Sequence, residues 1–514
     1  MENQRKQMYV NLIGQVVAFL INFGINFFLT PYIIEQVGRE AYGFVSLGNN
    51  FVTYASVVSV ALNSMSGRFI ALRIHQDDYE SANKYYASVI FSNMVLAVIL
   101  SVPFVLIVIF LDQLIVIESG MLFNVQILWS LLFINFVLSL ITSSVGVQLF
   151  TANRIDIKAK KGVEANLLRG LLMLLLFAIC GPHLWFIGIG AIVCSVYGIA
   201  TNFYYARKLV PQIRFCMKNV SWTTTKELLS SGVWNSIRSL GSIALTELDL
   251  LISNLFISPT AMGTLSIAKT VPSNISSFMG TICVAFMPQL TIEYAKCDKK
   301  EFVTSIKRCI RIHSFFVCVI YGTLFALLEP FFVVWLPEDT TDIHKIYILA
   351  ILSVCSCLVT AVTEVLFSVC TVINKVRYTS ILVVLTGLLS LFCTYFALKY
   401  TSLELYAVAG ISSFLCIIRS VMLLVPYVGK AIGEKWHCFY IDLFRSVIML
   451  LLSIAVGFMI KQFILREISW LYLILSGMIC VFVLGLLNGI FVLDRNDRKF
   501  LFNKFKRKGT GEQK

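Results

Sequence analysis

The chain has 514 residues, of which 58% are hydrophobic and only 14% are charged, and its mean hydropathy is +0.83. This composition excludes an ordinary soluble protein and an intrinsically disordered one, and it predicts an integral membrane protein. The formal net charge of +14 is spread over many short segments rather than one basic domain, so we expect no nucleic-acid partner.

Long apolar segments recur along the chain at a fixed offset. They begin near residues 8, 41, 84, 120, 163 and 184, and again near 228, 264, 309, 343, 377 and 403, about 220 residues later each time. Two further segments follow, over 441–460 and 468–492. About 20 apolar residues suffice to cross a bilayer as a helix. We therefore predict an all-α polytopic membrane protein with fourteen transmembrane helices.

The repeat also predicts how the helices are grouped. Six spans in each half give two co-oriented six-helix lobes, related by a pseudo-two-fold axis along the membrane normal. The N-terminal lobe should cover 1–206 and the C-terminal lobe 228–427, joined by a cytoplasmic linker over 207–227. Two extra C-terminal helices over 441–492 and a basic cytoplasmic tail over 493–514 complete the chain.

Basic residues indicate the orientation of these spans. With fourteen spans, most of the 42 lysines and arginines fall in loops on the side of the two termini, for example Lys158, Lys160 and Lys161. Since basic loops stay in the cytoplasm, we expect a multi-pass protein of the cell inner (cytoplasmic) membrane with both termini cytoplasmic.

Three basic side chains lie inside predicted spans of the second half. They are Arg238, Lys269 and Arg419. A charge at the centre of a helix costs about 2.5–3.5 kcal/mol on insertion scales, so each should face protein or water. One reading is a cationic site for a diphosphate, because guanidinium and ammonium groups suit phosphate oxygens. The other is structural pairing with carboxylates of neighbouring helices.

Three acidic side chains accompany them, namely Glu247, Asp249 and Glu364. They either neutralise the basic residues or bind a coupling proton or sodium ion. At 100° per residue, Asp249 shares a helix face with Ser231, Asn235, Arg238 and Ser242, which reads as a cavity wall. Glu247 points the other way, and its depth suits a salt bridge to Lys269.

The first half offers amides rather than charges. Asn22 and Asn26 share one face of the first span, together with Asn11 and Gln15. Asn49 shares a face of the second span with Thr53, Ser56 and Asn63. Such faces either hydrogen-bond neighbouring helices or line a hydrated cavity for sugar hydroxyls.

No catalytic or cofactor chemistry is expected. The fourteen cysteines include no C-x-x-C pair and none paired with histidine at the spacing of metal ligands. The loops are too short to hold a soluble catalytic domain, and no phosphate-binding P-loop occurs. His313 is expected to have a solvated or packing role rather than to couple protons. We therefore predict no enzyme activity, no cofactor and no metal site.

Two short motifs and the fourteen-helix plan resemble polysaccharide flippases of the multidrug/oligosaccharidyl-lipid/polysaccharide superfamily. The motifs are Thr30-Pro31-Tyr32 with Gly38 and Tyr42-Gly43, and Asp249-Leu250-Leu251-Ile252-Ser253. The resemblance covers nearly the whole chain, although Ser258 stands where the first repeat has Gly38. It implies a V-shaped pair of lobes that alternate in access. By similarity to lipid II flippases, the last two helices would line a groove for a prenyl tail.

The function implied is translocation of a polyprenyl-diphosphate-linked oligosaccharide, such as an O-antigen, capsule or related surface-glycan unit. The substrate would bind Arg238, Lys269, Arg419 and the amides Asn22, Asn26, Asn49 and Asn235. A multidrug or organic-cation antiporter of the same superfamily is the main alternative, and a membrane polymerase or ligase of lipid-linked sugars is a weaker one. Membrane lipids and a coupling ion are the other expected partners, and a monomer is expected because one chain supplies both lobes.

Overall fold

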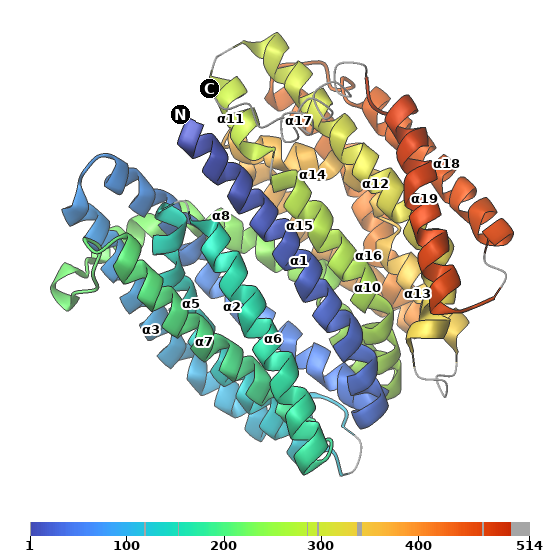
Figure 1. Ribbon diagram of the computed structural model, residues 1–514, viewed down its shortest axis with the longest axis horizontal. Helices are drawn as coiled ribbons and strands as arrows, with labels where there is room; N and C mark the ends of the chain where they lie inside the picture. Colours follow the sequence, from blue (N-terminus) through green and yellow to red (C-terminus); the bar gives the residue numbers. More distant parts are fainter. Residues whose placement is uncertain are drawn as a thin grey trace. The chain divides into compact units, whose positions relative to one another are not determined.

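Every regular element among the described residues is a helix (Figure 1). The computed structural model describes residues 2–117, 120–152, 154–284, 286–295, 298–336, 342–464 and 467–494. Helices satisfy their own backbone N–H and C=O groups, which lipid cannot do. The predicted all-α membrane fold is confirmed.

The chain forms two compact units, and unit 1 comprises Met1–Ile267 and Val383–Leu391. Its elements, in chain order, are α1 (Glu2–Val37), α2 (Arg39–His75), α3 (Tyr79–Ile109), α4 (Leu111–Leu114), α5 (Leu122–Thr151), α6 (Ile155–Cys180), α7 (Phe186–Leu209), the short 3₁₀ helix η1 (Met217–Asn219), α8 (Trp222–Thr246) and α9 (Leu248–Phe256). The start of α10 (Pro259–Val284) and the middle of α15 (Val376–Tyr400) also belong to it.

Unit 2 comprises Ala268–Leu382 and Phe392–Lys514. Besides the remainder of α10 and α15, its elements are α11 (Met287–Ala295), α12 (Lys299–Trp335), α13 (Ile343–Val354), α14 (Cys357–Val372), α16 (Leu405–Arg419), the π-helical segment η2 (Ser420–Leu424), α17 (Val425–Ala431), α18 (Tyr440–Ile464) and α19 (Trp470–Phe491). The two extra C-terminal helices are thus α18 and α19.

The number of spans agrees with the prediction once α10 is included. Among the described residues, thirteen segments are long and apolar enough to cross a membrane. The eighth predicted span is α10, which is more polar than these thirteen and carries Lys269, Thr270 and Asn274. Three of the thirteen spans are interrupted helices, formed by α8 with α9, by α13 with α14, and by α16, η2 and α17.

Helix starts repeat at the offset read from the sequence. In the first half α2, α3, α6 and α7 begin at residues 39, 79, 155 and 186, and in the second half α10, α12, α15 and α16 begin at 259, 299, 376 and 405. The cap of one helix is repeated as well. Asp78 accepts a hydrogen bond from the amide of Ser81 at the start of α3, and Asp298 accepts bonds from the amides of Lys300 and Glu301 at the start of α12. Equivalent positions therefore start helices by the same side-chain chemistry.

Equivalent residues of the two repeats also touch each other in unit 1. Ser266 Oγ on α10 donates to Ser46 Oγ on α2 at 2.5 Å. One turn earlier on each helix, a Cβ placed on Gly43 would lie 2.9 Å from the Cα atom of Gly263. Contacts between equivalent residues i and i + 220 are what a local two-fold relation between the two helices produces. The sequence repeat is therefore a structural repeat.

The departure at Ser258 has a local explanation. Gly38 precedes α2 with φ of +88°, a conformation that favours glycine, and its repeat equivalent Ser258 precedes α10. Ser258 is not among the described residues with positive φ, and its Oγ accepts a hydrogen bond from the amide of Ala261 at 3.0 Å. The second repeat thus starts its helix with a side-chain cap instead of a glycine turn.

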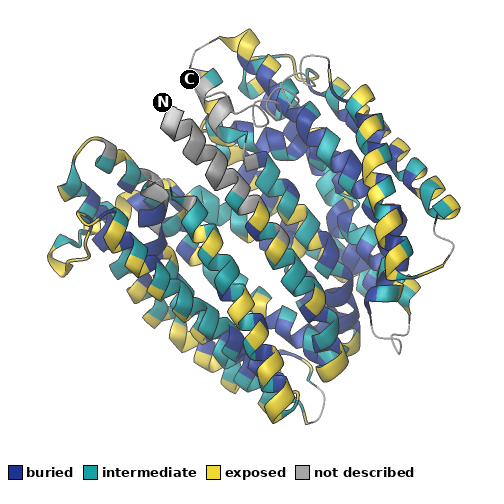
Figure 2. Cartoon of the chain, in the orientation of Figure 1, coloured by how far each residue is buried: buried dark blue, intermediate teal, exposed yellow. Residues whose placement is uncertain are grey.

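Many helices have one buried and one exposed side (Figure 2), and large hydrophobic residues are common among the exposed ones, as a lipid environment requires. Along α19, Leu473, Ser476 and Cys480 are buried, whereas Leu471, Phe482 and other large hydrophobic residues are exposed. A helix that is apolar on its exposed side would be insoluble in water but is stable against hydrocarbon.

Helix contacts inside unit 1 depend on glycine. A Cβ on Gly232 of α8 would lie 1.9 Å from the carbonyl oxygen of Ala61 on α2, and one on Gly241 would lie 2.5 Å from the amide nitrogen of Val384 on α15. Small residues allow two helix backbones to approach where no water is available to drive association. Unit 1 also includes the span over 222–256, which the repeat assigns to the second lobe. The predicted lobes over 1–206 and 228–427 stay a prediction.

Candidate functional site

A hollow lined by hydroxyl groups and apolar side chains lies between α2 and α5 in unit 1. Its volume is about 500 Å³, within the usual range of about 300–1,000 Å³ for small-molecule pockets. The lining residues are Val52, Thr53, Ser56, Ser59, Val60, Asn63, Ser64, Phe136, Ser139, Leu140 and Ser143. None of them is charged. We call this site the hydroxyl pocket.

Most hydroxyl groups of this pocket donate to backbone carbonyl groups of their own helices, whereas the Ser64 hydroxyl accepts a hydrogen bond from Asn235. Thr53 Oγ1 donates to the carbonyl of Asn49, and Ser59 Oγ to that of Ser56. On α5, Ser139 and Ser143 donate in the same way to Phe136 and Leu140. Each oxygen is then left with lone pairs and no proton to offer. The pocket wall thus combines acceptor oxygens with apolar side chains such as Val60 and Phe136, which suits a ligand that carries both hydroxyl groups and C–H faces.

Part of the pocket lining comes from the helix face predicted for the second span. Thr53, Ser56 and Asn63 line it, whereas Asn49 is exposed and its Nδ2 donates only to the Val45 carbonyl of the same helix. Two α5 residues that the sequence did not predict, Ser139 and Ser143, complete the lining. Their spacing of four residues places them on one helix face, but only the packing of α5 on α2 shows that this face meets the predicted one.

A buried amide pair supports the pocket. Asn93 Nδ2 on α3 donates to Asn63 Oδ1 on α2 at 2.9 Å and to Ser144 Oγ on α5 at 2.7 Å, and Asn63 Nδ2 returns a bond to Asn93 Oδ1 at 3.3 Å. Three helices are fixed by one network, so the pocket side of α2 cannot rotate freely.

The amides predicted on the first span face a neighbouring helix. Asn166 Nδ2 on α6 donates to Asn22 Oδ1 at 2.9 Å, and Arg169 Nη2, also on α6, donates to Asn26 Oδ1 at 2.8 Å. In the structure, Asn22 and Asn26 form hydrogen bonds between α1 and α6, which is the first of the two roles considered for them. Asn11 and Gln15 have side chains outside the described residues.

Asn235 and Arg238 lie on α8 and are both partly buried. Asn235 Nδ2 donates to Ser64 Oγ at 3.2 Å, so it reaches the rim of the hydroxyl pocket. The predicted face continues to Asp249, but α8 ends at Thr246 and Asp249 lies on α9. Asp249 is buried at 6% exposure.

The break between α8 and α9 is held by α2. Asn50 Nδ2 and Tyr54 Oη each donate to the backbone carbonyl of Glu247 at 2.7 Å. Thr246 Oγ1 donates to Glu247 Oε1 at 3.2 Å. Two external donors thus satisfy a carbonyl at the interruption, which fixes Glu247 and sets the position of Asp249.

The other predicted charged residues belong to unit 2. Lys269 and Glu364 are partly buried, whereas Arg419 is buried at 8% exposure, with its guanidinium 5.6 Å from the centroid of the Phe367 ring. Arg419 closes α16 where η2 begins, and π-helical turns are frequent at functional sites. The Nε and Nη1 atoms of Arg419 are buried without a hydrogen-bond partner. A joint cationic site of Arg238, Lys269 and Arg419 stays a prediction, as does a Glu247–Lys269 salt bridge.

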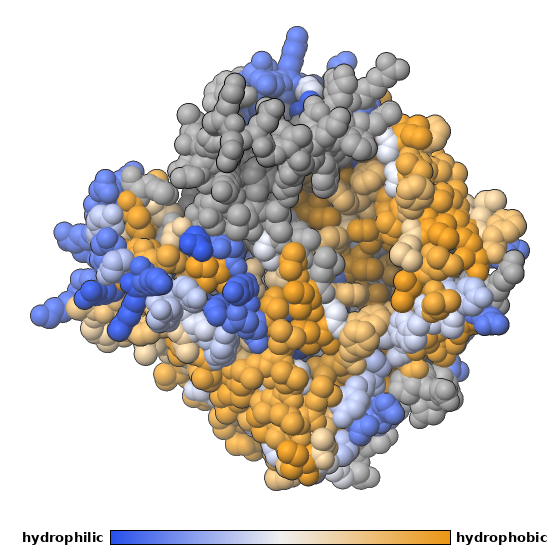
Figure 3. Space-filling model, viewed as in Figure 1, coloured by the Kyte–Doolittle hydropathy of each residue, from blue (hydrophilic) through white to orange (hydrophobic). Residues whose placement is uncertain are grey.

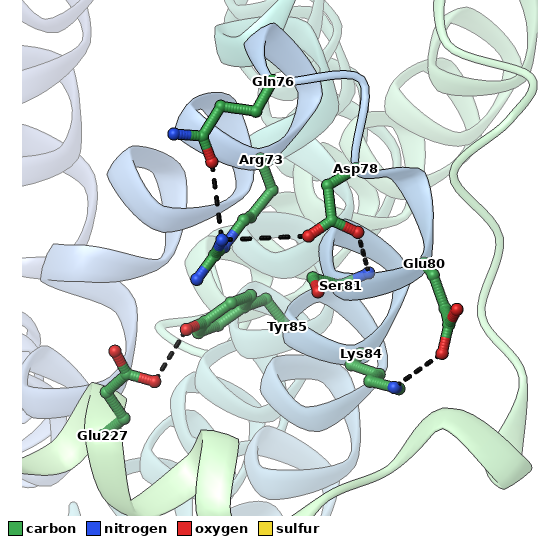
Figure 4. A network of polar contacts seen from close by, with 8 residues as sticks. All are labelled: Arg73, Gln76, Asp78, Glu80, Ser81, Lys84, Tyr85 and Glu227. Carbon is green, nitrogen blue, oxygen red and sulfur yellow. Dashed lines mark hydrogen bonds and ion pairs between the residues drawn. The ribbon is translucent and has the colours of Figure 1, made fainter.

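Polar contacts fix the turn between α2 and α3, at an end of unit 1 where hydrophilic side chains gather (Figures 3 and 4). Arg73 Nη1 donates to Gln76 Oε1 at 3.4 Å and lies 3.8 Å from Asp78 Oδ2. Asp78 Oδ1 accepts the Ser81 amide at 3.0 Å, and this hydrogen bond lowers the pKa of Asp78 below its ordinary value.

The same end attaches the segment between α7 and α8. Tyr85 Oη on α3 donates to Glu227 Oε2 on α8 at 2.7 Å (Figure 4). Asn83 Oδ1 accepts the amide of Arg214 at 2.7 Å. The predicted linker over 207–227 is therefore bonded to α3 rather than detached from the bundle. Among the residues searched, no group of three or more His, Cys, Asp or Glu side chains could hold a metal ion.

Comparison with known proteins agrees with this architecture. The chain is 27% identical to the uncharacterized membrane protein EpsK of Bacillus subtilis (strain 168), over 97% of this chain and 98% of that protein. The lipid II flippase MurJ in an inward closed conformation superimposes with a TM-score of 0.67 at 14% identity, covering 94% of this chain and 98% of MurJ.

A second solved structure has a related fold. An inward-facing multidrug resistance MATE family transporter of the MOP superfamily gives a TM-score of 0.65 at 14% identity, covering 83% of this chain and 98% of the transporter. At these identities the likeness concerns the fold alone. The family described as polysaccharide biosynthesis protein matches residues 6–292, more than half of the sequence. The chain therefore belongs to the polysaccharide biosynthesis protein family.

Proposed function

We propose that this protein is a flippase that translocates a polyprenyl-diphosphate-linked oligosaccharide across the cytoplasmic membrane by alternating access. The glycan would be a surface-polysaccharide unit such as an O-antigen or capsule repeat. No covalent bond is made or broken in this proposal, because transport requires only binding and a change of access.

The observation that carries the proposal is the hydroxyl pocket within the family-matched residues 6–292. Its lining oxygens accept hydrogen bonds, and a sugar presents many hydroxyl donors. A diphosphate presents only acceptors near neutral pH, and the same wall offers it no basic side chain and few hydrogen-bond donors. We therefore assign the sugar, and not the diphosphate, to the hydroxyl pocket.

The diphosphate would bind basic side chains within the spans. Arg238 shares α8 with Asn235, which contacts the pocket residue Ser64. Lys269 and Arg419 would complete the anion site in one state of the transport cycle. Asn22, Asn26 and Asn49 are not needed for it, because Asn22 and Asn26 bond α6 and Asn49 bonds its own helix.

The extent of the structural matches favours a lipid-linked cargo. MurJ covers 94% of this chain and the MATE transporter 83%. By similarity to MurJ, α18 and α19 are the helices that we propose for the lipid tail. We expect these two helices to serve the lipid tail, with both chain termini cytoplasmic and the protein acting as a monomer. Proteolysis of terminal epitope tags in right-side-out and inverted vesicles tests the topology.

The function is tested by deleting the gene and analysing the lipid-linked sugars of the membrane. We expect one glycan species to accumulate on the cytoplasmic leaflet, where externally added glycosidases cannot reach it in intact spheroplasts. Re-expression of the natural chain should clear it. If no lipid-linked sugar accumulates, the flippase proposal is wrong.

The fold shared with the MATE transporter supports one alternative, a multidrug or organic-cation antiporter. It predicts increased sensitivity to cationic drugs in the deletion strain without accumulation of a lipid-linked sugar. The uncharged pocket favours the glycan, because cationic drugs are held by carboxylates and aromatic faces.

A further inference from the structure

The segment that joins α7 to α8 carries charge of one sign. From residue 203 to residue 226 the chain has five basic residues and no acidic one, namely Arg207, Lys208, Arg214, Lys218 and Lys226. All five are exposed, and none of them forms an ion pair within the described part of the chain. The next residue, Glu227, accepts a hydrogen bond from Tyr85 (Figure 4). The positive charge of this segment is therefore available to an external anion.

Large apolar side chains are exposed on the same segment. Phe215, Met217 and Trp222 are 43%, 61% and 73% exposed. The span of α7 ends at Leu209 and the next span begins at Trp222, so the segment lies at a boundary of the bilayer. Aromatic side chains are enriched at this boundary, where one side is apolar and the other is wet. Orientation of the spans explains basic residues in such a loop, but it does not explain the exposed apolar ones.

Hydrogen bonds to α3 give the segment a fixed position. Asn83 Nδ2 donates to the carbonyl of Gln212 at 3.1 Å, and Asn83 Oδ1 accepts the amide of Arg214 at 2.7 Å. Further along the segment, the amide of Ser221 donates to Ser88 Oγ at 3.0 Å. Asn83 and Ser88 are separated by about 8 Å along the helix axis. The segment therefore lies along the start of α3 instead of extending away from the bundle.

The inner side of the segment belongs to the core of unit 1. Val210 and Ile213 are buried in one hydrophobic cluster with residues of α2, α3 and α8. Gln148 Nε2 on α5 also donates to the carbonyl of Ile213 at 3.0 Å. Phe215 and Met217 follow on the exposed side, so an apolar environment for them must come from outside the protein.

We propose that the segment over 203–226 is a docking surface for anionic phospholipids. Its lysines and arginines bind the headgroup phosphates, and Phe215, Met217 and Trp222 enter the apolar layer beneath the headgroups. Basic clusters directly beside a membrane span are typical of such surfaces. An acidic soluble protein would match the charges, but the apolar side chains beside the span favour a lipid. The inference does not depend on the proposed cargo.

The charge requirement is tested by lipid binding to the full chain. The purified protein is delipidated in detergent and titrated with phosphatidylglycerol or phosphatidylcholine, and bound lipids are counted by native mass spectrometry. The test variant combines Lys208→Gln, Lys218→Gln and Lys226→Gln. These three side chains are exposed and make no hydrogen bond within the described residues, so their replacement should leave the fold intact.

A control variant with the same change of net charge separates this surface from general electrostatics. It combines Lys300→Gln, Lys399→Gln and Lys430→Gln, three exposed residues of unit 2. We expect the natural chain to prefer phosphatidylglycerol, and this affinity to fall at least about tenfold in the test variant but less than about twofold in the control. Equal losses in the two variants, or no preference in the natural chain, would overturn the proposal.

Insertion of the apolar side chains is tested by fluorescence in nanodiscs of phosphatidylcholine and phosphatidylglycerol. The signal of Trp222 is the difference between the emission of the natural chain and that of Trp222→Phe. We expect lipids brominated on their acyl chains to quench this signal, and brominated phosphatidylglycerol to quench it more strongly than brominated phosphatidylcholine. A Trp222 signal that aqueous iodide quenches and brominated lipids do not would show that the segment faces water, which overturns the docking surface.

Discussion

Ser266 donates a hydrogen bond to Ser46 over 2.5 Å, and the two serines occupy the same position in repeats that are 220 residues apart. Glu40 and Thr260, with the same separation, are also hydrogen-bonded. These contacts place the local two-fold relation of the repeats at the crossing of α2 and α10. A substitution at this crossing therefore acts on both repeats at once.

Gly263 should not tolerate a side chain. A methyl group there would lie 2.6 Å from the carbonyl oxygen of Arg39, a backbone atom that can move only with α2. We expect Gly263→Ala to lower the free energy of unfolding by about 1–3 kcal/mol, as overpacking usually does. Gly280→Ala in the same helix is the control, since nothing lies within 4 Å of a methyl group there. Thermal unfolding in detergent measures both, and equal stability of the two variants would contradict the close crossing.

We expect Asn26 to stabilise the protein because its side-chain oxygen accepts a hydrogen bond from the guanidinium group of Arg169. Asn26→Ala removes the acceptor of Arg169 Nη2, whose Nε is already buried without a partner. Leaving a buried donor unpaired costs about 1–3 kcal/mol. Asn49→Ala is the control, because the Asn49 amide is exposed and bonds only its own helix. The two variants are compared by reversible unfolding in mixed micelles, and a loss no greater in Asn26→Ala than in Asn49→Ala would exclude this role.

Filling the hydroxyl pocket should stop sugar binding without unfolding the protein. Ser143→Leu removes an acceptor and occupies the cavity, so we expect glycan flipping to fall at least about tenfold, or about 1.4 kcal/mol. Ser130→Leu, also on α5, is the control, because Ser130 lines an apolar groove with Phe133 and Ile134. Flipping and thermal stability are measured together. Normal flipping in a stable Ser143→Leu protein would place the sugar elsewhere.

The Asp78 cap should be sensitive to loss of its side-chain acceptor. Asp78→Ala should make the Ser81 amide exchange about fivefold faster with deuterium, whereas Asp78→Asn keeps an acceptor and should exchange nearly as the natural chain does. Hydrogen exchange with mass spectrometry reads this end of α3 directly. Equal protection in all three proteins would show that the cap does not hold the helix.

The same cap predicts a pH dependence. The pKa of Asp78 is lowered in the folded protein, so its contribution to stability is complete above the unfolded pKa of about 3.9. The contribution is lost as the pH falls through the lower folded value. Protection of Ser81 should therefore persist at neutral pH and decline only in strong acid, and Asp78→Asn should not show this decline.

Much of the fold could be predicted from the sequence because few backbone structures can span a lipid bilayer. Apolar segments of sufficient length must be helices, and the offset of about 220 residues between them reappears in helix starts, in the caps Asp78 and Asp298, and in the Ser46–Ser266 contact. The face of Thr53, Ser56 and Asn63 was also readable, since helical spacing fixes which side chains share a side.

Which helix each face meets was decided only by tertiary structure. From the sequence, Asn22 and Asn26 are as suitable for lining a cavity as Thr53 and Ser56. In the structure, α6 contacts Asn22 and Asn26 through hydrogen bonds. Thr53 and Ser56 line the pocket together with Ser139 and Ser143 of α5. The partners of His313 could not be predicted either, because they are the backbone carbonyls of Ala361 and Met279. The periodicity of the sequence predicts the direction in which a side chain points from its own helix axis. A site also needs residues of a second helix opposite that side chain. Which helix lies there depends on how all the helices pack.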